Sequence, residues 1–465
     1  MPRSLDFNFS EAHGLCGTWA SDYAALHSRI RARALKAYLT QQQAEKSREN
    51  EEEVSFGTPV LKPYGIDQQP AELMTDGRLD PPVRFLTFEW LDGCGGFADV
   101  LAGLVTALVV AILDNRALIV RNHCLPKAFE PSMINWEPGP FVPLEPARNL
   151  TLVDYGWGRV VPERARDGEV VLVWLRDKFV RIEPFFKELE GAVNVRMTSN
   201  RGVLTWLQTR AKGEWAERFK AMGMRLPYAL GCSLRFLMRP KPEVQALFHS
   251  IERRLRRRSW AGKAGAGRPR VATVGIHIRV RDRVVWAGDR GAPKELSAKQ
   301  VDVLIAGARK WIVCAQRVES YWFPSSVAVR WMLITNSAQL KAALKSRFPY
   351  KVITTDFIPR HANSLSSSSV GSIGNGSSTP SPGEVDGQVE GEKGDTKREQ
   401  ERLFQELVTE WLLLASCDAY VISVSGYSST AVYYANRPMA AFESGNCDPE
   451  KPLRAKFQGK ARGRI

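Results

Sequence analysis

The stretch RFLTFEWLDGCGGFADVLAGLVTALVVAILDNRALIV, from Arg84 to Val120, decides the fold class of this chain. Residues 84–90 alternate as a strand does, and a glycine-rich turn separates them from residues 97–115, whose long apolar pattern predicts a helix. Residues 116–120 predict the next strand. A strand, a helix and a strand in this order form a βαβ unit with parallel strands and a right-handed crossover.

A second alternating series follows residue 270 and predicts another parallel sheet covered by helices. Between the strands, the helical patterns cover residues 297–318, 337–348, 400–417 and 428–436. The expected strands are 271–280, 327–336, 350–356, 419–424 and 438–443. The fold class expected from the pattern is therefore α/β, with two Rossmann-like domains in tandem.

Composition shifts divide the chain into five parts. They are an N-terminal helical extension (1–82), a Rossmann-like domain (83–252), a basic linker (253–270), a second Rossmann-like domain (271–445) and a basic tail (446–465). The extension begins with a helical pattern over 21–39, and residues 41–53 are a surface loop or a continuation of that helix. Residues 362–395 are rich in Ser, Gly, Pro and acidic residues, which predicts a disordered insertion.

The chain has 465 residues and a formal net charge of +15, which favours anionic partners. Much of the excess positive charge lies in residues 253–270 and 451–465. No recognisable DNA- or RNA-binding motif accompanies these segments, so a solvated linker and tail are preferred to a nucleic-acid surface. No specific nucleic-acid partner is expected.

The seven cysteines include no CxxC pair, which argues against a zinc ribbon or a thioredoxin-type motif. Because their number is odd, at least one thiol is expected to be free.

The longest apolar run, 100–113, stops at Asp114 and is too short to span a membrane, so it predicts a core helix. The first residues lack the apolar run of a signal peptide, and no membrane anchor is visible in this chain.

Charged residues gather where the strand 271–280 ends. His277 and Arg279 are two positions apart and are expected on one face of that strand. Because ligands of parallel sheets bind beyond the carboxyl ends of strands, an arginine there would suit a phosphate, which it can bind through two parallel hydrogen bonds. An ion pair between an arginine and Asp282 at the strand end is the equally weighted alternative.

Two loops between a strand and a helix are further candidates for a ligand site. Gly95 and Gly96 belong to an incomplete glycine motif that either admits a ligand or forms a plain turn. Hydroxyl groups and free backbone N–H groups at a helix start bind anions, although capping the helix is their commoner role. The second loop supplies such hydroxyls from Ser425, Ser428, Ser429 and Thr430.

Two more strand ends in the second domain carry polar residues. Asn336 and Ser337 follow one strand, and Asp356 ends the next. Asp356 could accept hydrogen bonds from a guanine edge or a ribose, whereas a turn-forming aspartate is the favoured alternative.

Several segments, taken in their order along the chain, resemble the fucosyltransferase superfamily, in particular algal and plant members related to α1,2- and α1,6-fucosyltransferases and protein O-fucosyltransferases. The likeness covers about residues 14–443 without the insertion. The segments are GLCGTWASDYAALHSRI, CGGFADVLAGLVTALVVAILDNRALIV, AFEPSMINW, TSNRGVL, YALGCSLRFLMRP, GIHIRVRD and EWLLLASCDAYVISVSGYSSTA.

The resemblance implies a GT-B fold, with two Rossmann-like domains whose parallel sheets face a central cleft. It implies inverting transfer of fucose from GDP-fucose to a hydroxyl of a glycan or glycoprotein, without a metal or another cofactor. The N-terminal domain would hold the acceptor and the C-terminal domain the nucleotide sugar. Residence in the lumen of the Golgi or endoplasmic reticulum would follow, and a cytoplasmic location is the alternative.

The resemblance also assigns roles to residues. The arginine of the family's H-x-R motif holds the donor pyrophosphate and corresponds to Arg279, with His277 beside it. An arginine fixed there stabilises the charge that develops on the departing phosphate. Hydroxyls from Ser428 to Thr430 would assist, and Asp282 or Asp99 would take the acceptor proton.

The chain departs from the family pattern at three places. Arg281 stands where many relatives have glycine, residues 334–337 read ITNS in place of a TDS-like strand end, and the first turn reads GGFAD without the asparagine or arginine of some relatives. A catalytically inactive relative that binds sugar or protein is therefore the main alternative function. A polyanion-binding protein, with steep salt dependence, is a further one.

Overall fold

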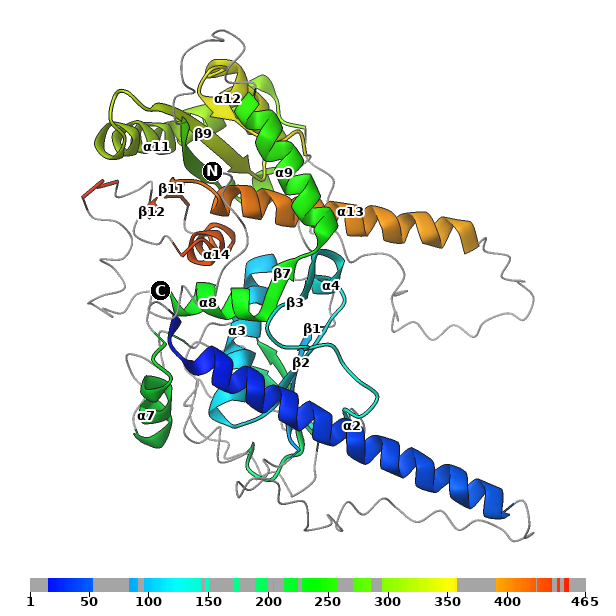
Figure 1. Ribbon diagram of the computed structural model, residues 1–465. Helices are drawn as coiled ribbons and strands as arrows, with labels where there is room; N and C mark the ends of the chain where they lie inside the picture. The colour runs from blue at the N-terminus through cyan, green and yellow to red at the C-terminus, as the bar shows by residue number, and fades with distance from the viewer. Residues whose placement is uncertain are drawn as a thin grey trace.

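The structure is a computed structural model, and it divides into two α/β halves (Figure 1). Its described residues are 16–52, 83–90, 96–143, 147–149, 170–175, 189–199, 204, 213–224, 228–257, 271–285, 295–357, 390–423, 425–436, 441–443 and 447–450.

The N-terminal half contains a five-stranded parallel sheet with the order β2-β1-β6-β5-β4. Helix α3 (Phe97–Leu113) crosses from β1 to β2, as the sequence predicts. Gly103 lets α3 lie directly on β6, because a Cβ atom at this position would be 1.7 Å from the carbonyl oxygen of Ser199. The strands are β1 (Phe85–Trp90), β2 (Ala117–Asn122), β4 (Ala147–Asn149), β5 (Val170–Leu175) and β6 (Asn194–Ser199).

The C-terminal half contains a second five-stranded parallel sheet with the order β10-β9-β8-β11-β12. The predicted fold class of two Rossmann-like domains with parallel sheets is thus confirmed. The strands are β8 (Val271–Ile278), β9 (Ala328–Thr335), β10 (Val352–Ile353), β11 (Ala419–Ile422) and β12 (Ala441–Glu443). The helices are α10 (Asp282–Val285), α11 (Ala298–Trp322), α12 (Ala338–Arg347), α13 (Glu390–Ala415) and α14 (Gly426–Tyr434).

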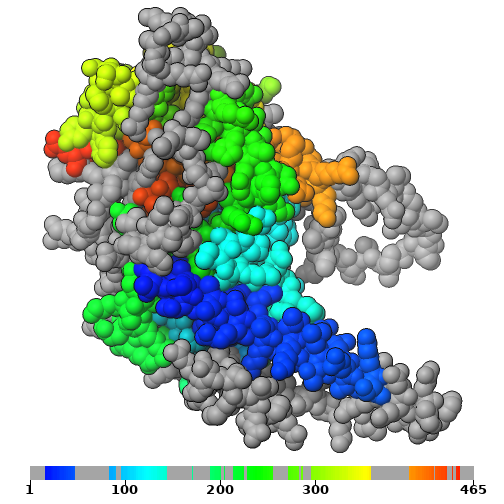
Figure 2. Space-filling model, viewed as in Figure 1, coloured from blue at the N-terminus to red at the C-terminus, as the bar shows by residue number. Residues whose placement is uncertain are grey.

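Short elements and one long helix connect the two sheets. Helix α9 packs against α13, and Arg254 of α9 forms an ion pair with Asp356 at 3.2 Å, so α9 lies on the C-terminal half (Figures 1 and 2). Because α9 continues to Arg257, the start of the predicted basic linker is helical. These elements are α4 (Leu125–Ala128), β3 (Phe129–Pro131), α7 (Gly213–Ala221), α8 (Ala229–Leu237), β7 (Met238–Pro240) and α9 (Pro242–Arg257).

Helix α2 (Trp19–Glu52) covers the outer edge of the N-terminal sheet, and Figure 2 shows it lying along the lower half of the molecule. The hydroxyl of Tyr23 accepts a hydrogen bond from the backbone N–H of Leu118 and donates one to the carbonyl of Arg116, each at 3.0 Å. His27 Nε2 lies 2.9 Å from the carbonyl of Leu118. These bonds satisfy backbone groups of β2 that an edge strand would otherwise expose. The helix includes residues 41–52, which decides in favour of a continued helix there.

Disulfide bonds connect distant parts of the chain. Cys16 is bonded to Cys232 of α8, and Cys314 of α11 is bonded to Cys447. Cys124 is also disulfide-bonded. Cys417 is buried and takes part in no disulfide, which confirms the expectation that at least one cysteine keeps its thiol.

Helix α13 begins inside the segment that composition predicts to be disordered. It starts at Glu390, so the prediction is wrong for residues 390–395, and the rest of the insertion from 362 to 389 lies outside the described residues. Glutamate and lysine are good helix formers, and they let the amphipathic helix extend into a polar segment. No helix in the described part of the chain is long and apolar enough to cross a membrane.

Candidate nucleotide site

The carboxyl end of β8 carries a buried histidine. His277 is 5% exposed, and its Nδ1 atom lies 3.0 Å from the hydroxyl of Ser423, which follows β11. Its ring also lies 5.5 Å from the ring of Tyr427, measured between centroids. Burial, with a smaller contribution from the charge of Arg279, lowers the pKa of His277 to about 3. The imidazole is therefore neutral at physiological pH.

Arg279 supplies the positive charge at this strand end. Its side chain is exposed, whereas its backbone N–H donates to the hydroxyl of Ser423 at 3.3 Å. The backbone N–H of Ser423 in turn donates to the carbonyl of His277 at 3.1 Å. These bonds hold the ends of β8 and β11 together. Asp282 opens the short helix α10, and its side chain lies outside the described part of the chain.

The first turn of α14 lies beside this strand end. Ser425 is the N-cap residue, with an extended backbone at φ −145° and ψ 135°. Its hydroxyl is buried and has no hydrogen-bond partner in the part of the chain that the structure describes. A buried hydroxyl without a partner at a helix start is suited to a ligand, because the helix end favours negative charge.

The other predicted hydroxyls of this helix have different surroundings. Ser428 donates to the carbonyls of Ser423 and Ser425, both at 3.2 Å. Thr430 donates to the carbonyl of Tyr427 at 3.0 Å and accepts from the indole of Trp411 at 3.1 Å. Ser429 is half-buried. The structure therefore uses Ser428 and Thr430 to hold α14 in place, whereas the hydroxyl of Ser425 is left without a partner among the described residues.

Asn336 and Ser337 support the backbone near Arg279. The amide of Asn336 accepts from the N–H of Val280 and donates to its carbonyl, both at 2.8 Å. Ser337 caps α12, since its hydroxyl accepts from the N–H of Leu340 at 3.3 Å. Asn336 thus fixes the residue that follows Arg279.

Asp356 is exposed and lies beyond β10, which ends at Ile353 and is shorter than the predicted strand 350–356. Its carboxylate pairs with Arg254 at 3.2 Å and with Lys345 at 3.5 Å. These surface ion pairs give Asp356 a structural partner on either side, α9 and α12. Its proposed contact with a nucleotide stays a prediction.

Helix α3 of the N-terminal half brings Asp99 to the same region. Asp99 is exposed, and its Oδ2 atom would lie 2.7 Å from a Cβ atom placed on Gly96, so the carboxylate folds back over the helix start. A Cβ atom on Gly426 of α14 would lie 2.8 Å from the Cβ atom of Ala98. The first turns of α3 and α14 are therefore in contact. Gly95 lies outside the described residues.

Two supporting residues of this site were not identified from the sequence. Ser423 joins β8 to β11, and the ring of Tyr427 lies between His277 and Phe97, whose ring centroid is 6.3 Å away. The tyrosine belongs to the same SGYSST segment as the predicted hydroxyls, so that segment contained a signal for it.

A second charged cluster, also not predicted, lies near the carboxyl end of β1. Glu89 is 3% exposed, and its two carboxylate oxygens accept from Arg121 and Arg196, each at 2.8 Å. Both Glu89 and Arg121 are the next-to-last residues of their strands, and charged residues at these positions were the sequence signal for the cluster.

Among the described residues, no group of three or more His, Cys, Asp or Glu side chains could hold a metal ion.

No protein-family model matches the chain, and no curated protein matches it. Among solved structures, a mutant of Arabidopsis thaliana FUT1 in complex with GDP matches with a TM-score of 0.51 and 13% sequence identity, covering 92% of this chain and 78% of that one. The fucosyltransferase NodZ from Bradyrhizobium matches with a TM-score of 0.35 and 13% identity, over 75% of this chain and 91% of that one. The likeness to FUT1 shows that the chain shares the two-domain fold expected from the family resemblance, the GT-B fold.

Proposed function

We propose that the chain is a glycosyltransferase that binds GDP-fucose at the end of β8 and transfers fucose to a hydroxyl of a glycan or glycoprotein. Two observations carry the proposal. The exposed Arg279 follows β8, whose end contacts α14 through Tyr427, and the buried hydroxyl of Ser425 at the start of α14 has no partner among the described residues. The FUT1 structure that shares the fold contains GDP, which supports a nucleotide in the same class of site.

The site offers three kinds of contact to a pyrophosphate. Arg279 supplies a full positive charge and directional N–H donors. The start of α14 supplies the partial positive charge of a helix end, and Ser425 supplies a hydroxyl. His277 adds no charge because it is neutral, and its part is to hold Ser423 and thereby the backbone of Arg279.

The proposed transfer is a single displacement. The acceptor oxygen forms a bond to C1 of fucose while the bond from C1 to the phosphate oxygen breaks, and GDP leaves with the electron pair. Arg279 stabilises the negative charge that grows on the departing phosphate, which lowers the barrier more than it tightens substrate binding. A carboxylate takes the acceptor proton.

Two carboxylates are candidates for this base. Asp99 is exposed in the first turn of α3, beside the first turn of α14, and Asp282 begins α10 shortly after Arg279.

Because Arg279 and the helix end already supply positive charge at the phosphates, we expect transfer to proceed without a metal. Gly95, Gly96, Asn336, Ser337 and Asp356 complete the proposed donor site.

We infer that the protein works in an oxidising compartment, which agrees with a Golgi or endoplasmic reticulum lumen. The described residues include the disulfides Cys16–Cys232 and Cys314–Cys447, and Cys124 is bonded as well. Such bonds form and persist in secretory compartments and are rare in the cytosol.

Calorimetric titration of the purified protein with GDP, UDP and ADP tests the proposal. We expect binding of GDP in preference to both other nucleotides, followed by transfer from GDP-fucose in a screen of glycan acceptors. GDP binding without transfer to any acceptor would support the inactive relative. Indifference to all three nucleotides, with salt-sensitive binding to heparin, would support the polyanion-binding protein instead.

A further inference from the structure

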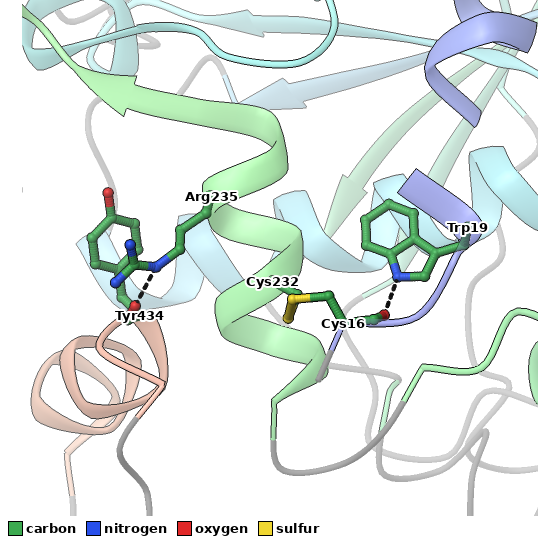
Figure 3. The surroundings of a disulfide bond; sticks show 5 residues. All are labelled: Cys16, Trp19, Cys232, Arg235 and Tyr434. Carbon is green, nitrogen blue, oxygen red and sulfur yellow. Dashed lines mark hydrogen bonds between the residues drawn. A yellow bond between two sulfur atoms is a disulfide. The ribbon is translucent and has the colours of Figure 1, made fainter. Parts of the chain in front are cut away.

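Helix α8 of the N-terminal half packs against the carboxyl end of α14. Gly231 lies against α14 so closely that a Cβ atom there would be 2.0 Å from the carbonyl oxygen of Tyr433. One turn later, Nε of Arg235 donates to the carbonyl of Tyr434 at 2.6 Å. The guanidinium carbon of Arg235 also lies 4.4 Å from the centre of the Tyr434 ring (Figure 3). Arg235 thus combines a hydrogen bond, a cation–π contact and a charge that matches the negative helix end.

The opposite end of α14 is the proposed nucleotide site. The helix has nine residues and is about 13 Å long, so it moves as one short rod. Its first turn contacts Ala98 through Gly426 and His277 through Tyr427. A displacement of the carboxyl end therefore reaches the turn that carries Ser425.

Helix α8 is itself fixed to the N-terminal half. Cys232 is bonded to Cys16, and the indole N–H of Trp19 donates to the carbonyl of Cys16 at 2.7 Å (Figure 3). The rings of Trp19 and Phe236 lie 4.9 Å apart. Residues of the N-terminal extension thus hold the helix from which Arg235 reaches α14.

We propose that Arg235 is a positioning residue of the nucleotide site: it holds α14 from the N-terminal half and so sets the position of Ser425 relative to Arg279. The inference rests on the proposed function. It adds that Arg235, a residue of the N-terminal half, tunes nucleotide binding through α14 without itself touching the nucleotide.

The test compares Arg235→Ala with Arg239→Ala. Arg239 is an exposed arginine of β7 that pairs with Glu130 at 2.7 Å, so its variant removes the same side chain from the next element of the chain. We expect Arg235→Ala to weaken GDP binding about tenfold, which corresponds to the loss of about one hydrogen bond to the nucleotide. Arg239→Ala should bind GDP as the wild type does. Arg235→Lys keeps the charge but loses the planar stack, and should fall between the two.

A second control separates positioning from general destabilisation. Phe85→Leu weakens the separate core under α2, and we expect it to lower the melting temperature while GDP affinity, measured well below that temperature, is unchanged. If Arg235→Ala does not fold, Arg235→Lys decides. Unchanged GDP affinity in a folded Arg235 variant would overturn the inference.

Hydrogen exchange keeps the inference testable if the wild type binds no GDP, an outcome that would defeat the proposed function alone. In Arg235→Ala or Arg235→Lys, the amide of Ser429, which donates to the carbonyl of Ser425 at 3.1 Å, should exchange about fivefold faster than in the wild type and in Arg239→Ala. Faster exchange confined to residues 433–436 would show that the carboxyl end of α14 moves without its first turn, and the inference would be wrong.

Discussion

The carboxyl ends of β1 and β8 differ in how their charged side chains are arranged. Each strand lies between two parallel neighbours in a five-stranded sheet. Near the end of β1, the buried carboxylate of Glu89 is bridged by Arg121 and Arg196. After β8, Arg279 is exposed, and the imidazole of His277 before it is buried and neutral.

The difference separates a structural cluster from the candidate ligand site. In the N-terminal half, the opposite charges satisfy one another, so their main effect is on stability. In the C-terminal half, the arginine faces solvent beside a helix start with an unpartnered buried hydroxyl at Ser425. A buried hydroxyl that has no partner among the described residues, as at Ser425, is the feature that indicates a ligand.

Removing Glu89 should have the largest effect on stability. Glu89→Ala leaves two arginines without their shared carboxylate, and we expect the free energy of unfolding to fall by about 3 kcal/mol. Urea denaturation measures the loss, and GDP affinity should not change. Wild-type stability together with lost transfer would show instead that Glu89 takes part in the reaction.

Acid should destabilise both halves through one buried histidine each. Burial lowers the pKa of His27 to about 4 and that of His277 to about 3, whereas the pKa of a histidine in the unfolded chain is about 6.5. Because the unfolded chain then binds protons more readily, the stability is fully present above about pH 6.5 and falls as the pH drops toward the folded pKa.

Each histidine contributes up to about 1.4 kcal/mol per pH unit to this fall. The variants His27→Gln and His277→Gln should each reduce the slope of unfolding free energy between pH 6 and pH 4.5, measured by urea denaturation. Equal slopes in the wild type and both variants would mean that neither imidazole is kept neutral by the fold.

Asp356→Ala should have the smallest effect. Its ion pairs with Arg254 and Lys345 are exposed, so we expect the unfolding free energy to change by less than about 1 kcal/mol. A loss above about 2 kcal/mol would contradict this expectation. The same variant tests the nucleotide contact: loss of a bond to guanine would change the preference for GDP over UDP, loss of a bond to the ribose would weaken both nucleotides, and loss of a turn-forming aspartate would change neither.

The alternation of strands and helices could be predicted because both periodicities are local. The βαβ unit of residues 84–120 and the strand 271–278 follow from residues that are neighbours in sequence. The attachment of α2 could not be predicted, since Tyr23 and His27 bind backbone atoms of β2 that are distant in sequence. The start of α13 was missed because a polar, charged segment has the composition of a disordered one.

The candidate site shows the same limit. His277 and Arg279 could be selected because a charged motif ends an apolar strand. Sequence could not distinguish Ser425 from Ser428, because only the packing of α14 decides which hydroxyl finds a carbonyl. The cluster around Glu89 depends on β6 lying beside β1, and the order of strands in a sheet cannot be predicted from local sequence patterns.

One pair of titrations tests the comparison of the two strand ends most directly. Arg279→Ala and Arg121→Ala remove the same side chain from the carboxyl ends of the two sheets, and both variants are titrated with GDP beside the wild type. We expect Arg279→Ala to lose about 2 to 5 kcal/mol of binding free energy and Arg121→Ala to bind GDP within about twofold of the wild type. Unchanged GDP binding by folded Arg279→Ala, or an equal loss in both variants, would contradict a nucleotide site at the end of β8.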